Sequence, residues 1–399
     1  MAREATGAEG EARRRIADRG RITFAEFMAV ALYWPNGGYY ASARNPLGAS
    51  GDFYTSPHVH PLFGALLARQ AEQAWRLLGS PPGFAVVEAG AGDGRLAADV
   101  LAALPTLRYL GVDLRPPPAR AFGLAWALSA GLPVRGLHGV VLTNELLDAM
   151  PVHRVTMQDG ALREVYAAAG AGGALTADLG PLSSPALAAR LDALGVRLGQ
   201  GQTAEVNLAL GDWLRSLATS LERGWALLID YGHEARDYYA PSRARGTLRC
   251  YYQHTVSADP FRLVGRQDMG AHVELTTLKR EAADAGLALA GDVSQAEFLR
   301  NLGLAEARTR VLARSGLRPA ERRANADAVD ALADLDGLGG FRVVGLAKGI
   351  GNARLAGFDP STADGLLPLP EPPLLTAAHL PRPGAPPPSD PLSWDELAR

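Results

Sequence analysis

The stretch Glu88-Ala89-Gly90-Ala91-Gly92-Asp93-Gly94 decides the fold of this 399-residue chain. It follows the apolar run 84–87, which predicts a short buried strand, and it precedes a helix that we predict over residues 96–104. Glycines between a strand and a helix let the backbone turn tightly and approach a bound ligand closely. The stretch therefore predicts a strand-turn-helix unit of an α/β fold, although a glycine-rich turn without a ligand has the same local pattern.

Other apolar runs of strand length follow along the chain, and predicted helices separate them. Such runs are typical of strands buried on both faces, and the helices between them indicate parallel order. We therefore expect an α/β protein with a doubly wound, mostly parallel, seven-stranded Rossmann-like sheet, an N-terminal helical segment and α/β insertions. After Asp113 the connection is short and rich in proline, so we expect a stunted helix near 122–128 and a very short strand near Val134. The other predicted strands are 107–113, 139–144, 225–230, 287–292 and 341–346.

We divide the chain into three parts. Helical periodicity before residue 80 predicts an N-terminal helical segment, in which Thr23 caps a helix that begins near Phe24. Beyond Asp359 the prolines are too dense to join helices or sheets, so we expect an extended, unpacked tail. The three parts are 1–80, which includes the Gly51–Pro57 loop; 81–349, the α/β core with insertions near 151–222 and 233–280 and a helical excursion over 302–338; and 350–399, the proline-rich tail.

Composition and charge argue against several classes of function. Hydrophobic residues make up 47% and charged residues 21% of the chain, which is typical of a globular protein. A formal net charge of -2 indicates no general surface for nucleic acid, and no apolar stretch is long enough to insert into a membrane. The single cysteine, Cys250, cannot form an internal disulfide, and no Cys/His spacing indicates a metal site. The acids Glu4, Glu9 and Glu11 argue against a targeting segment, so we expect a cytoplasmic location.

The spacing of the glycines indicates which ligand the turn binds. A dinucleotide-binding turn reads G-x-G-x-x-G, whereas Gly90, Gly92 and Gly94 alternate as G-x-G-x-G. Glu88 before the glycines suits a cationic ligand, and Asp113 ends the next strand, where an acid can bind ribose hydroxyls. S-adenosylmethionine has an ammonium, a sulfonium and a ribose but no phosphate. We therefore predict that these five residues bind S-adenosylmethionine, and the spacing disfavours a nicotinamide oxidoreductase.

Several separate blocks of the sequence resemble the MidA-type methyltransferases, over about residues 22–348. The resemblance implies a methyltransferase sheet that binds S-adenosylmethionine. The mitochondrial members of this family are complex I assembly factors that methylate a protein arginine, so it also implies an arginine side chain of a partner protein as methyl acceptor. The blocks are Gly38-Tyr39-Tyr40, Gly51-Asp52-Phe53-Tyr54-Thr55-Ser56-Pro57, Phe63-Gly64, Asn144-Glu145-Leu146-Leu147-Asp148-Ala149-Met150-Pro151, Asp230-Tyr231-Gly232-His233, Gly246-Thr247-Leu248-Arg249 with His254, and Gln295 with Phe298-Leu299.

The sequence departs from the family's pattern at a few positions. His58 and His60 stand where the family usually has Glu and Ser, next to its most distinctive block. Ala91 replaces the proline of a common Gly-Pro-Gly turn, and Glu274 stands where the family tends to have Asp. We expect the two histidines to affect the identity of the substrate more than the type of reaction.

The ends of the predicted strands bring candidate catalytic residues together. In a doubly wound sheet, ligands lie beyond the carboxyl ends of the strands, where Asn144, Glu145 and Tyr231 would project. Under the resemblance, Glu145 is the best candidate to orient a guanidinium through paired hydrogen bonds, and Asp148 is the second. Asn144 could bind the target or the methionine end of the cofactor, and Tyr231 could line the target channel. Without the resemblance, Asn144 as N-cap and Glu145 as first-turn acid of a helix explain the same residues.

The Gly51–Pro57 block predicts a loop ahead of the sheet. Its residues Asp52, Thr55 and Ser56 could bond the cofactor or close over it as a lid. A turn anchored by the Asp and Ser side chains is the alternative.

Two other functions remain open besides methylation of a protein arginine. A small-molecule methyltransferase would have the same cofactor site, and an assembly factor could bind S-adenosylmethionine without catalysing transfer. The sequence indicates neither the partner protein, nor the number of methyl groups added, nor the oligomeric state.

Overall fold

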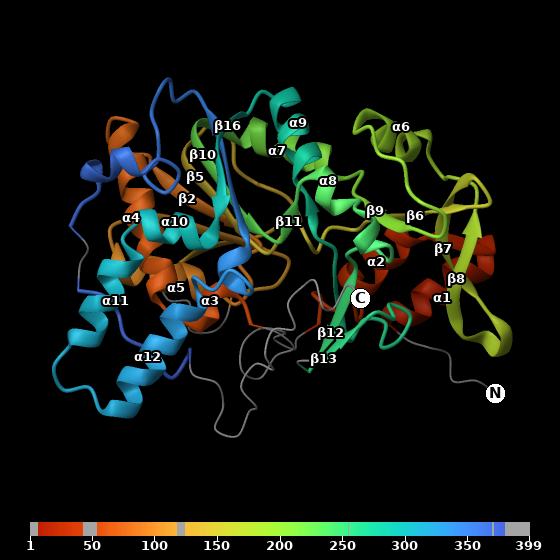
Figure 1. The fold of residues 1–399 in the computed structure, drawn as a ribbon, viewed down its shortest axis with the longest axis horizontal. Coiled ribbons are helices and arrows are strands. Elements are labelled where there is room, and N and C mark those ends of the chain that lie inside the picture. Colours follow the sequence, from red (N-terminus) through yellow and green to blue (C-terminus); the bar gives the residue numbers. More distant parts are fainter. Residues whose placement is uncertain (1–6, 43–53, 118–123, 254, 369–370, 380–399) are drawn as a thin grey trace.

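A seven-stranded mixed sheet forms the centre of the structure, a computed structural model that describes residues 7–42, 54–117, 124–253, 255–368 and 371–379 (Figure 1). The strands lie in the order β16 (Ala288–Ser294), β17 (Arg342–Lys348), β10 (Leu221–Asp230), β5 (Leu137–Asn144), β2 (Ala85–Ala89), β3 (Arg108–Asp113) and β4 (Ala125–Leu128). Pairing is parallel from β10 to β4, whereas β17 runs antiparallel to both β10 and β16. The expected α/β class is confirmed.

Helices cover both faces of this sheet because both faces are apolar. One face carries α4 (Leu62–Leu77) and α5 (Arg95–Ala103), and the other carries α7 (Leu210–Ser220) and α9 (Leu275–Asp284). In β5, Val140 and Leu142 belong to the buried cluster with α4 and α5, whereas Val141 belongs to the cluster with α7 and α9. Successive side chains of a strand point to opposite faces, so a strand between two helical layers reads as an unbroken apolar run.

The chain after β3 differs from its prediction. We expected a stunted helix near 122–128 and a strand near Val134, but β4 occupies 125–128 and Val134 lies in a loop. The Trp126 indole N–H donates to the Arg115 carbonyl at 2.9 Å, and its ring lies against Gly111, where a Cβ would come within 2.6 Å of it. These tertiary contacts, which local propensity does not encode, favour the extended conformation. Residues 118–123 lie outside the described residues.

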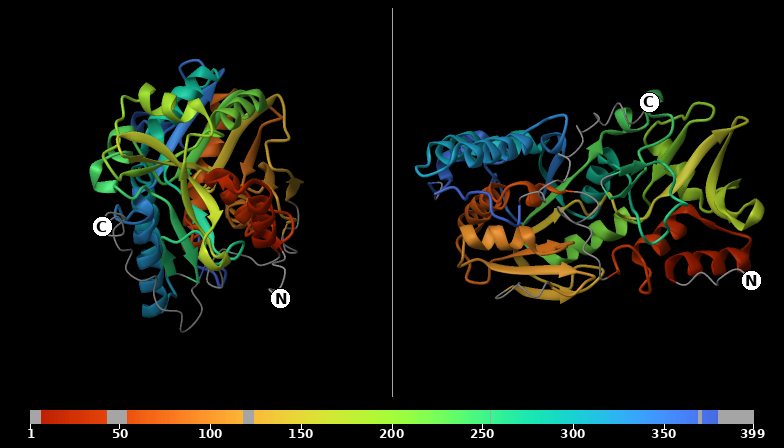
Figure 2. Two further views of the ribbon diagram at one scale, coloured as in Figure 1. Left: turned by 90° about the vertical axis from the view of Figure 1, so that its right-hand side faces the viewer. Right: turned by 90° about the horizontal axis from the view of Figure 1, so that it is seen from below.

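A second lobe lies beside the main sheet, built from the N-terminal helices and the insertions (Figures 1 and 2). It contains α1 (Gly7–Arg19), β1 (Arg21–Thr23), α2 (Phe24–Tyr33), β6 (His153–Gln158), β7 (Ala161–Ala169), β8 (Leu175–Gly180), α6 (Pro185–Ala193) and β9 (Thr203–Val206). Its largest sheet has the order β1-β7-β6-β9, with β8 paired to β7. Phe24 and Phe27 of α2 are fully buried in a cluster that includes Leu248 and Met269. The second insertion adds β11 (Gly232–His233), α8 (Ala235–Tyr238), β12 (Arg249–Tyr252), β13 (Thr255–Ser257), β14 (Asp268–Gly270) and β15 (Val273–Glu274).

The helical excursion and the chain after residue 350 cover the opposite end of the main sheet (Figure 1). The excursion contains α11 (Leu304–Ala313) and α12 (Pro319–Ala331), and it follows α10 (Gln295–Asn301). Beyond β17, the backbone N–H groups of Ala356 and Gly357 donate at 2.9 Å to the side chains of Gln73 and Gln70 on α4. These buried hydrogen bonds attach the end of the chain to the helical layer of the core.

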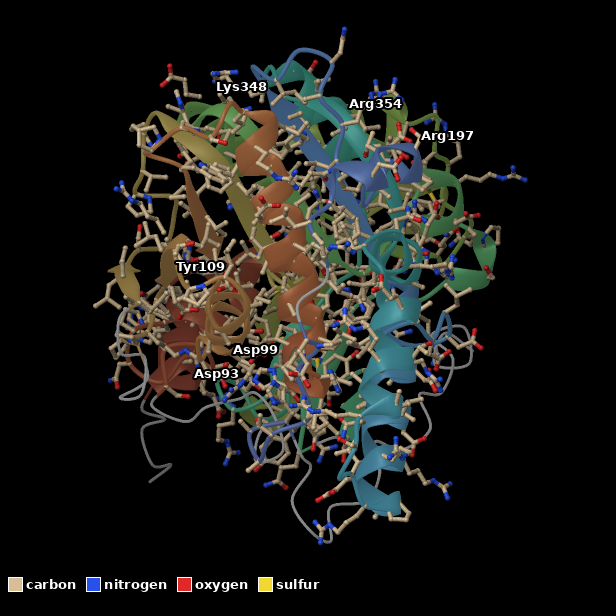
Figure 3. All side chains as sticks on the ribbon, turned by 90° about the vertical axis from the view of Figure 1, so that its left-hand side faces the viewer. Asp93, Asp99, Tyr109, Arg197, Lys348 and Arg354 are labelled. Carbon is tan, nitrogen blue, oxygen red and sulfur yellow. The ribbon has the colours of Figure 1, made fainter. Side chains whose placement is uncertain are left out.

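The described part of the proline-rich tail is packed, so the expectation of an unpacked tail is wrong as far as residue 379. His379 is only 4% exposed, and its Nε2 lies 3.0 Å from Oδ2 of Asp99 on α5, a residue that Figure 3 labels next to Asp93. The Thr376 hydroxyl lies 2.8 Å from Nδ1 of the same ring. An extended segment can therefore dock through a few buried polar contacts without joining a helix or sheet. Residues 380–399 lie outside the described residues.

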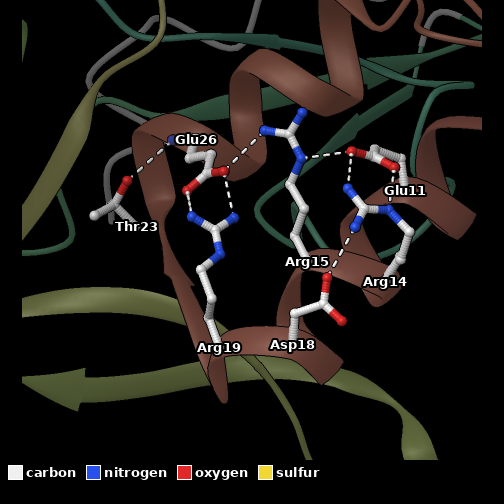
Figure 4. A network of polar contacts seen from close by, with 7 residues as sticks. All are labelled: Glu11, Arg14, Arg15, Asp18, Arg19, Thr23 and Glu26. Atoms are coloured by element: carbon white, nitrogen blue, oxygen red, sulfur yellow. Dashed lines mark hydrogen bonds and ion pairs between the residues drawn. The ribbon is translucent and has the colours of Figure 1, made fainter.

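The N-terminal helices are joined by a polar network. As predicted, Thr23 caps α2: its Oγ1 accepts from the Glu26 N–H at 3.1 Å. The Glu26 carboxylate accepts from Arg15 and Arg19 of α1 (Figure 4). Partly exposed ion pairs contribute about 0–1 kcal/mol each. The network therefore fixes the angle between the two helices more than it stabilises the fold.

The described residues contain neither a membrane-spanning helix nor a cluster of metal ligands. Every helix among them is too short or too polar to cross a lipid bilayer. No group of three His, Cys, Asp or Glu side chains in those same ranges is arranged to hold a metal ion. Cys250 is buried, and burial raises the pKa of its thiol to about 12, so the thiol stays protonated at neutral pH.

Replacing His379 with alanine should destabilise the protein, because it leaves the Asp99 carboxylate without its buried partner. Losing a hydrogen bond to a charged group costs about 2 kcal/mol, which should lower the melting temperature by about 3 °C. Differential scanning fluorimetry measures this shift. The control, His138→Ala, removes a more exposed histidine–glutamate contact of 3.5 Å and should lower it by less than about 1 °C. Equal shifts in the two variants would show that the tail contact contributes nothing beyond a surface pair.

Candidate active site

A cavity of about 450 Å³ opens at the carboxyl ends of β2, β3 and β5, where an α/β sheet binds its ligands. Its volume lies in the range of small-molecule sites. The predicted site residues that line it are Thr55, Glu88, Gly90, Gly92, Asp113, Asn144 and Glu145. Among the described residues, Ser56, Gly94, Asp148 and Tyr231 lie outside the cavity lining. Asp52 lies outside the described residues.

The glycine turn adopts a backbone conformation that side chains disfavour. The φ angles of Gly90, Gly92 and Gly94 are 76°, 59° and 74°, in the left-handed region. The Gly90 N–H donates to the Val112 carbonyl at 2.8 Å, which ties the turn to the neighbouring strand β3. A Cβ on Gly90 would come within 2.9 Å of the Leu146 side chain. The turn therefore packs between two strand ends and exposes its backbone to the cavity.

Glu88 is a buried acid at the end of β2, 3% exposed. Burial raises the pKa of its carboxyl to about 8, with a smaller contribution from Asp93 and Asp113, although the Tyr109 hydroxyl donates to it at 2.8 Å. Figure 3 labels Tyr109 and Asp93 on this side of the molecule. A desolvated acid of this kind is stabilised in its ionised form by a cation. The position therefore suits a positively charged ligand.

Asp113 ends β3 and lies across the glycine turn. One carboxylate oxygen accepts from the Gly92 N–H at 2.8 Å, and the other accepts from the Arg115 N–H at 2.9 Å. Nearby, the side-chain oxygen of Asn144 is buried and has no hydrogen-bond partner in the described part of the chain. A roomy cavity with two acids, an exposed glycine backbone and an unsatisfied amide oxygen fits a cofactor that carries a ribose and a positive charge.

The loop after β5 is not a helix start, so the interpretation of Asn144 as an N-cap is wrong. Glu145 has a left-handed φ of 53°, and residues 145–150 form turns and bends. The Glu145 N–H donates to the Ile229 carbonyl at 2.8 Å, and the Asn144 side-chain amide donates to the Glu145 carboxylate at 3.0 Å. A positive φ at a non-glycine residue costs free energy and is often found at functional sites.

Four carboxylates lie close together behind this loop. Glu145 and Asp148 follow β5, Asp230 ends β10, and Asp268 begins β14. Burial and the neighbouring Asp148 raise the pKa of Glu145 well above its ordinary value, and burial and Asp230 do the same for Asp148. Burial and Glu145 raise the pKa of Asp230 to about 8. The fourth, Asp268, accepts from the Tyr40 hydroxyl at 2.8 Å. One oxygen of Asp148 has no partner among the residues described. Among the described residues, the charges that raise the pKa values of Glu145, Asp148 and Asp230 therefore come from other carboxylates.

Aromatic residues border the cluster. Tyr33 and Tyr40 stack at 5.6 Å and line the cavity, and the Tyr33 hydroxyl donates to the Ala149 carbonyl at 2.7 Å. Tyr231, the predicted channel residue, packs on Phe341 at 3.8 Å between ring centroids. Burial and the Glu145 carboxylate raise the pKa of the Tyr231 hydroxyl.

The short helix α3 (Ser56–Val59) with its N-cap Thr55 lies between the glycine turn and the carboxylates, and its first turn is called here the Thr55–His58 turn. His58 lines the cavity, with Nδ1 2.8 Å from the Thr55 hydroxyl and Nε2 3.1 Å from the Asp93 carboxylate. The Ser56 backbone adjoins Glu145 and slightly lowers the pKa of its carboxyl. His60 lies apart: its Nδ1 accepts from the Leu62 N–H at 3.0 Å, and burial lowers its pKa to about 4.

Sequence reasoning missed several residues around the cavity. Tyr40 belongs to a quoted block, and Asp230 ends a predicted strand at the edge where ligands were expected, so Asp230 was placed at the site but neither residue was assigned a role. Asp268 and the contact between His58 and Asp93 had none, because they join segments that are far apart in the sequence. Glu274, another departure from the family, caps α9 by accepting from the N–H groups at 276 and 277.

Comparisons with known proteins agree with this geometry. Residues 66–109 and 119–293 match a family of S-adenosyl-L-methionine-dependent methyltransferases. A solved structure from Burkholderia thailandensis, bound to S-adenosyl-homocysteine, is 34% identical, covers 88% of this chain and 94% of its own, and has a TM-score of 0.79. A second structure from that organism, also 34% identical, covers 88% of this chain and 94% of its own and has a TM-score of 0.76.

Curated relatives have a more specific name. "Protein arginine methyltransferase NDUFAF7, mitochondrial" of Mus musculus is 29% identical over 339 residues, with 75% of this chain and 74% of the relative covered. The Drosophila melanogaster homologue is 30% identical over 331 residues, with 73% of each covered. Both are named as mitochondrial, which contradicts our expectation of a cytoplasmic location. The chain belongs to the MidA-type family of S-adenosyl-L-methionine-dependent methyltransferases.

Proposed function

We propose that this methyltransferase transfers a methyl group to an arginine side chain of a partner protein. The names of the mouse and fly relatives support the proposal. The observation that carries it is the buried group of carboxylates beside the cavity, in which the charges that act on Glu145, Asp148 and Asp230 come chiefly from other carboxylates. A guanidinium is a planar cation with five N–H donors, and it matches such a group in both charge and hydrogen bonding.

The reaction places two demands on the residues of this chain. S-adenosylmethionine would supply the activated methyl group and leave as S-adenosylhomocysteine, and the carboxylates Glu145 and Asp148, whose pKa values are raised, would accept the proton that the guanidinium nitrogen loses. Glu145 would orient the guanidinium, because its carboxylate is held by the Asn144 amide and lies beside the Ser56 backbone. Asp148 would provide the second carboxylate, since one of its oxygens is buried without a partner in the described ranges. Together they position the nucleophile in a site from which water is excluded.

The aromatic pair Tyr33 and Tyr40 supports the same acceptor. The two stacked rings line the cavity between the glycine turn and the carboxylates. An arginine side chain has an apolar stem behind its charged head, and a flat aromatic wall suits both parts. We assign these tyrosines to the acceptor side, with Tyr231 behind Glu145 as a supporting residue.

On the cofactor side, the roles follow from charge and position. Glu88 would face the cationic part of S-adenosylmethionine, and Asp113 would bind the ribose hydroxyls at the end of β3. Gly90 and Gly92 would let the backbone approach, Gly94 would start α5, and the Asn144 amide oxygen would accept from the methionine end. Thr55 lines the cavity from the opposite wall, and Asp52 stays a prediction.

The division of the chain into parts is also a proposal. The seven-stranded sheet within 81–349 would act as the Rossmann-like cofactor platform, with the insertions near 151–222 and 233–280 and the 302–338 excursion around it. The 1–80 segment would supply the tyrosines and the Thr55–His58 turn. The 350–399 tail would hold the excursion against the core.

Replacing Glu145 with glutamine should abolish most methyl transfer, because the neutral amide cannot balance the charge of a guanidinium. Purified protein and methyl-labelled S-adenosylmethionine are added to an extract of cells that lack this gene. We expect one discrete labelled protein, with modified arginine found by mass spectrometry, and a loss of roughly 100-fold in rate for Glu145→Gln. Glu222→Gln, a change of an exposed glutamate, is the matched control and should retain the wild-type rate.

Other distributions of label would contradict the proposal. Label only in small molecules would assign a small-molecule acceptor. No label in either fraction, with S-adenosylhomocysteine still bound, would favour an assembly factor that does not catalyse transfer.

The affinity for S-adenosylmethionine should rise with pH. The pKa of Glu88 is raised to about 8, so its carboxyl is largely protonated at neutral pH in the free protein. A cationic ligand favours the carboxylate, so binding releases a proton, and affinity should increase by up to tenfold per pH unit between about pH 6.5 and pH 8. Isothermal titration calorimetry at several pH values measures this slope. The amino group of the ligand also titrates and contributes to the slope in both proteins. Glu88→Gln should remove only the contribution of Glu88 and so give a flatter slope than the wild type. Identical slopes in the two proteins would exclude Glu88 as the group responsible.

A further inference from the structure

We propose that His58 is a positioning residue, which fastens the Thr55–His58 turn to the glycine turn and thereby retains the cofactor and sets the direction of Glu145. Retention of the cofactor rests on the established family alone, whereas the effect on Glu145 also rests on the proposed function. The role is separate from the reaction itself, because His58 would act through its neighbours.

His58 connects the two turns through both of its ring nitrogens. Its side chain is 6% exposed, and the two contacts are 2.8 Å to the Thr55 hydroxyl and 3.1 Å to the Asp93 carboxylate. One arrangement of protons satisfies both contacts in a neutral ring: the hydroxyl donates to Nδ1, and Nε2–H donates to the carboxylate. An imidazole therefore spans the gap between a loop and the cofactor turn without needing a charge.

Asp93 is a firm anchor for this contact. It lies inside the glycine turn, and its second oxygen accepts at 3.2 Å from the Arg95 N–H, at the first residue of α5. Burial alone would raise the pKa of Asp93, but the contacts with His58 and Arg95 outweigh burial and lower the pKa to about 2. The carboxylate is thus ionised under working conditions, and hydrogen bonds to an ionised acceptor are roughly twice as strong as neutral ones.

The other end of the turn contacts the acceptor side. The Ser56 backbone adjoins Glu145 and slightly lowers the pKa of its carboxyl, and the Ser56 hydroxyl donates at 2.9 Å to the side chain of Gln295 on α10. Pro57 follows directly and restricts the backbone between Ser56 and His58. A displacement of His58 from Asp93 would therefore also displace the Ser56 backbone that adjoins Glu145. The turn connects cofactor binding to the geometry of the acceptor carboxylate.

The test compares three variants of the full chain. His58→Leu keeps the volume but removes both contacts, His58→Gln keeps an N–H donor for Asp93, and Asp93→Asn removes the charge of the anchor. The release of S-adenosylhomocysteine is followed by stopped-flow fluorescence. We expect release to be about tenfold faster in His58→Leu, a difference of about 1.4 kcal/mol, and close to the wild-type rate in His58→Gln.

Coupling between the two residues separates positioning from mere destabilisation. If His58 acts through Asp93, the double variant His58→Leu/Asp93→Asn should release the product no faster than the faster single variant. The matched control is His60→Gln, a buried histidine two residues away that contacts Asn325 instead of the glycine turn. It should lower the melting temperature without changing the release rate. Additive effects of the two changes, or a wild-type release rate in His58→Leu, would overturn the proposal.

The effect on Glu145 is measured separately from the retention of the cofactor. At saturating S-adenosylmethionine, the rate of labelled methyl transfer to extract protein should still fall several-fold in His58→Leu and recover in His58→Gln. A full rate at saturation would overturn the part that concerns Glu145 and leave retention intact. If the wild-type protein labels no protein at all, the proposed function fails, but the release rates still decide whether His58 retains the cofactor.

Discussion

The carboxylate of Asp230 holds the loop that forms the acceptor side of the cavity. It ends β10, and it accepts from the N–H groups of Leu147 at 2.8 Å, Asp148 at 3.2 Å and Tyr231 at 2.8 Å. A buried carboxylate destabilises a fold unless hydrogen bonds compensate for its lost hydration. Because the amides of residues 147 and 148 are bonded to Asp230, the loop cannot continue as a helix, and Glu145 adopts its left-handed backbone. The position of the proposed acceptor carboxylate is therefore set by a residue on the neighbouring strand.

The second lobe completes the cavity through hydrogen bonds to that same region. The Tyr33 hydroxyl reaches the Ala149 carbonyl, in the loop that Asp230 holds. The Tyr40 hydroxyl reaches Asp268 of β14, beside Gly270, where a Cβ would come within 3.0 Å of the Asp148 carboxylate. Each lobe thus supplies groups that the other needs to satisfy its buried polar atoms. The insertions and the N-terminal helices thus help to shape the site: Tyr33 and Gly270 of the second lobe contact Ala149 and Asp148 of the core loop, and Tyr40 holds Asp268 within the second lobe.

Features encoded by nearby residues were predictable from the sequence, and those that depend on distant contacts were not. The glycine turn after β2 and the Thr23 cap follow from spacing and side-chain chemistry within a few residues. The extended conformation at Trp126 depends on Gly111 of another strand, and the docking of His379 depends on Asp99, 280 residues earlier. Asn144 followed by an acid is good helix-start chemistry, but the hydrogen bonds to Asp230 override it. The site was predictable where strand ends converge, and it was missed where a loop crosses between them.

The contacts of His58, which departs from the family's pattern, indicate a role at the cofactor turn. His58 lies beside the family's most distinctive block, so we expected it to affect the choice of substrate. In the structure its imidazole faces the glycine turn. A glutamate at this position would place a second carboxylate near the ionised Asp93, and like charges at this separation repel. An imidazole at this position carries no negative charge, so it removes that repulsion and adds contacts to Thr55 and Asp93. The imidazole therefore affects how the cofactor turn is held and, through the neighbouring Ser56, the surroundings of Glu145.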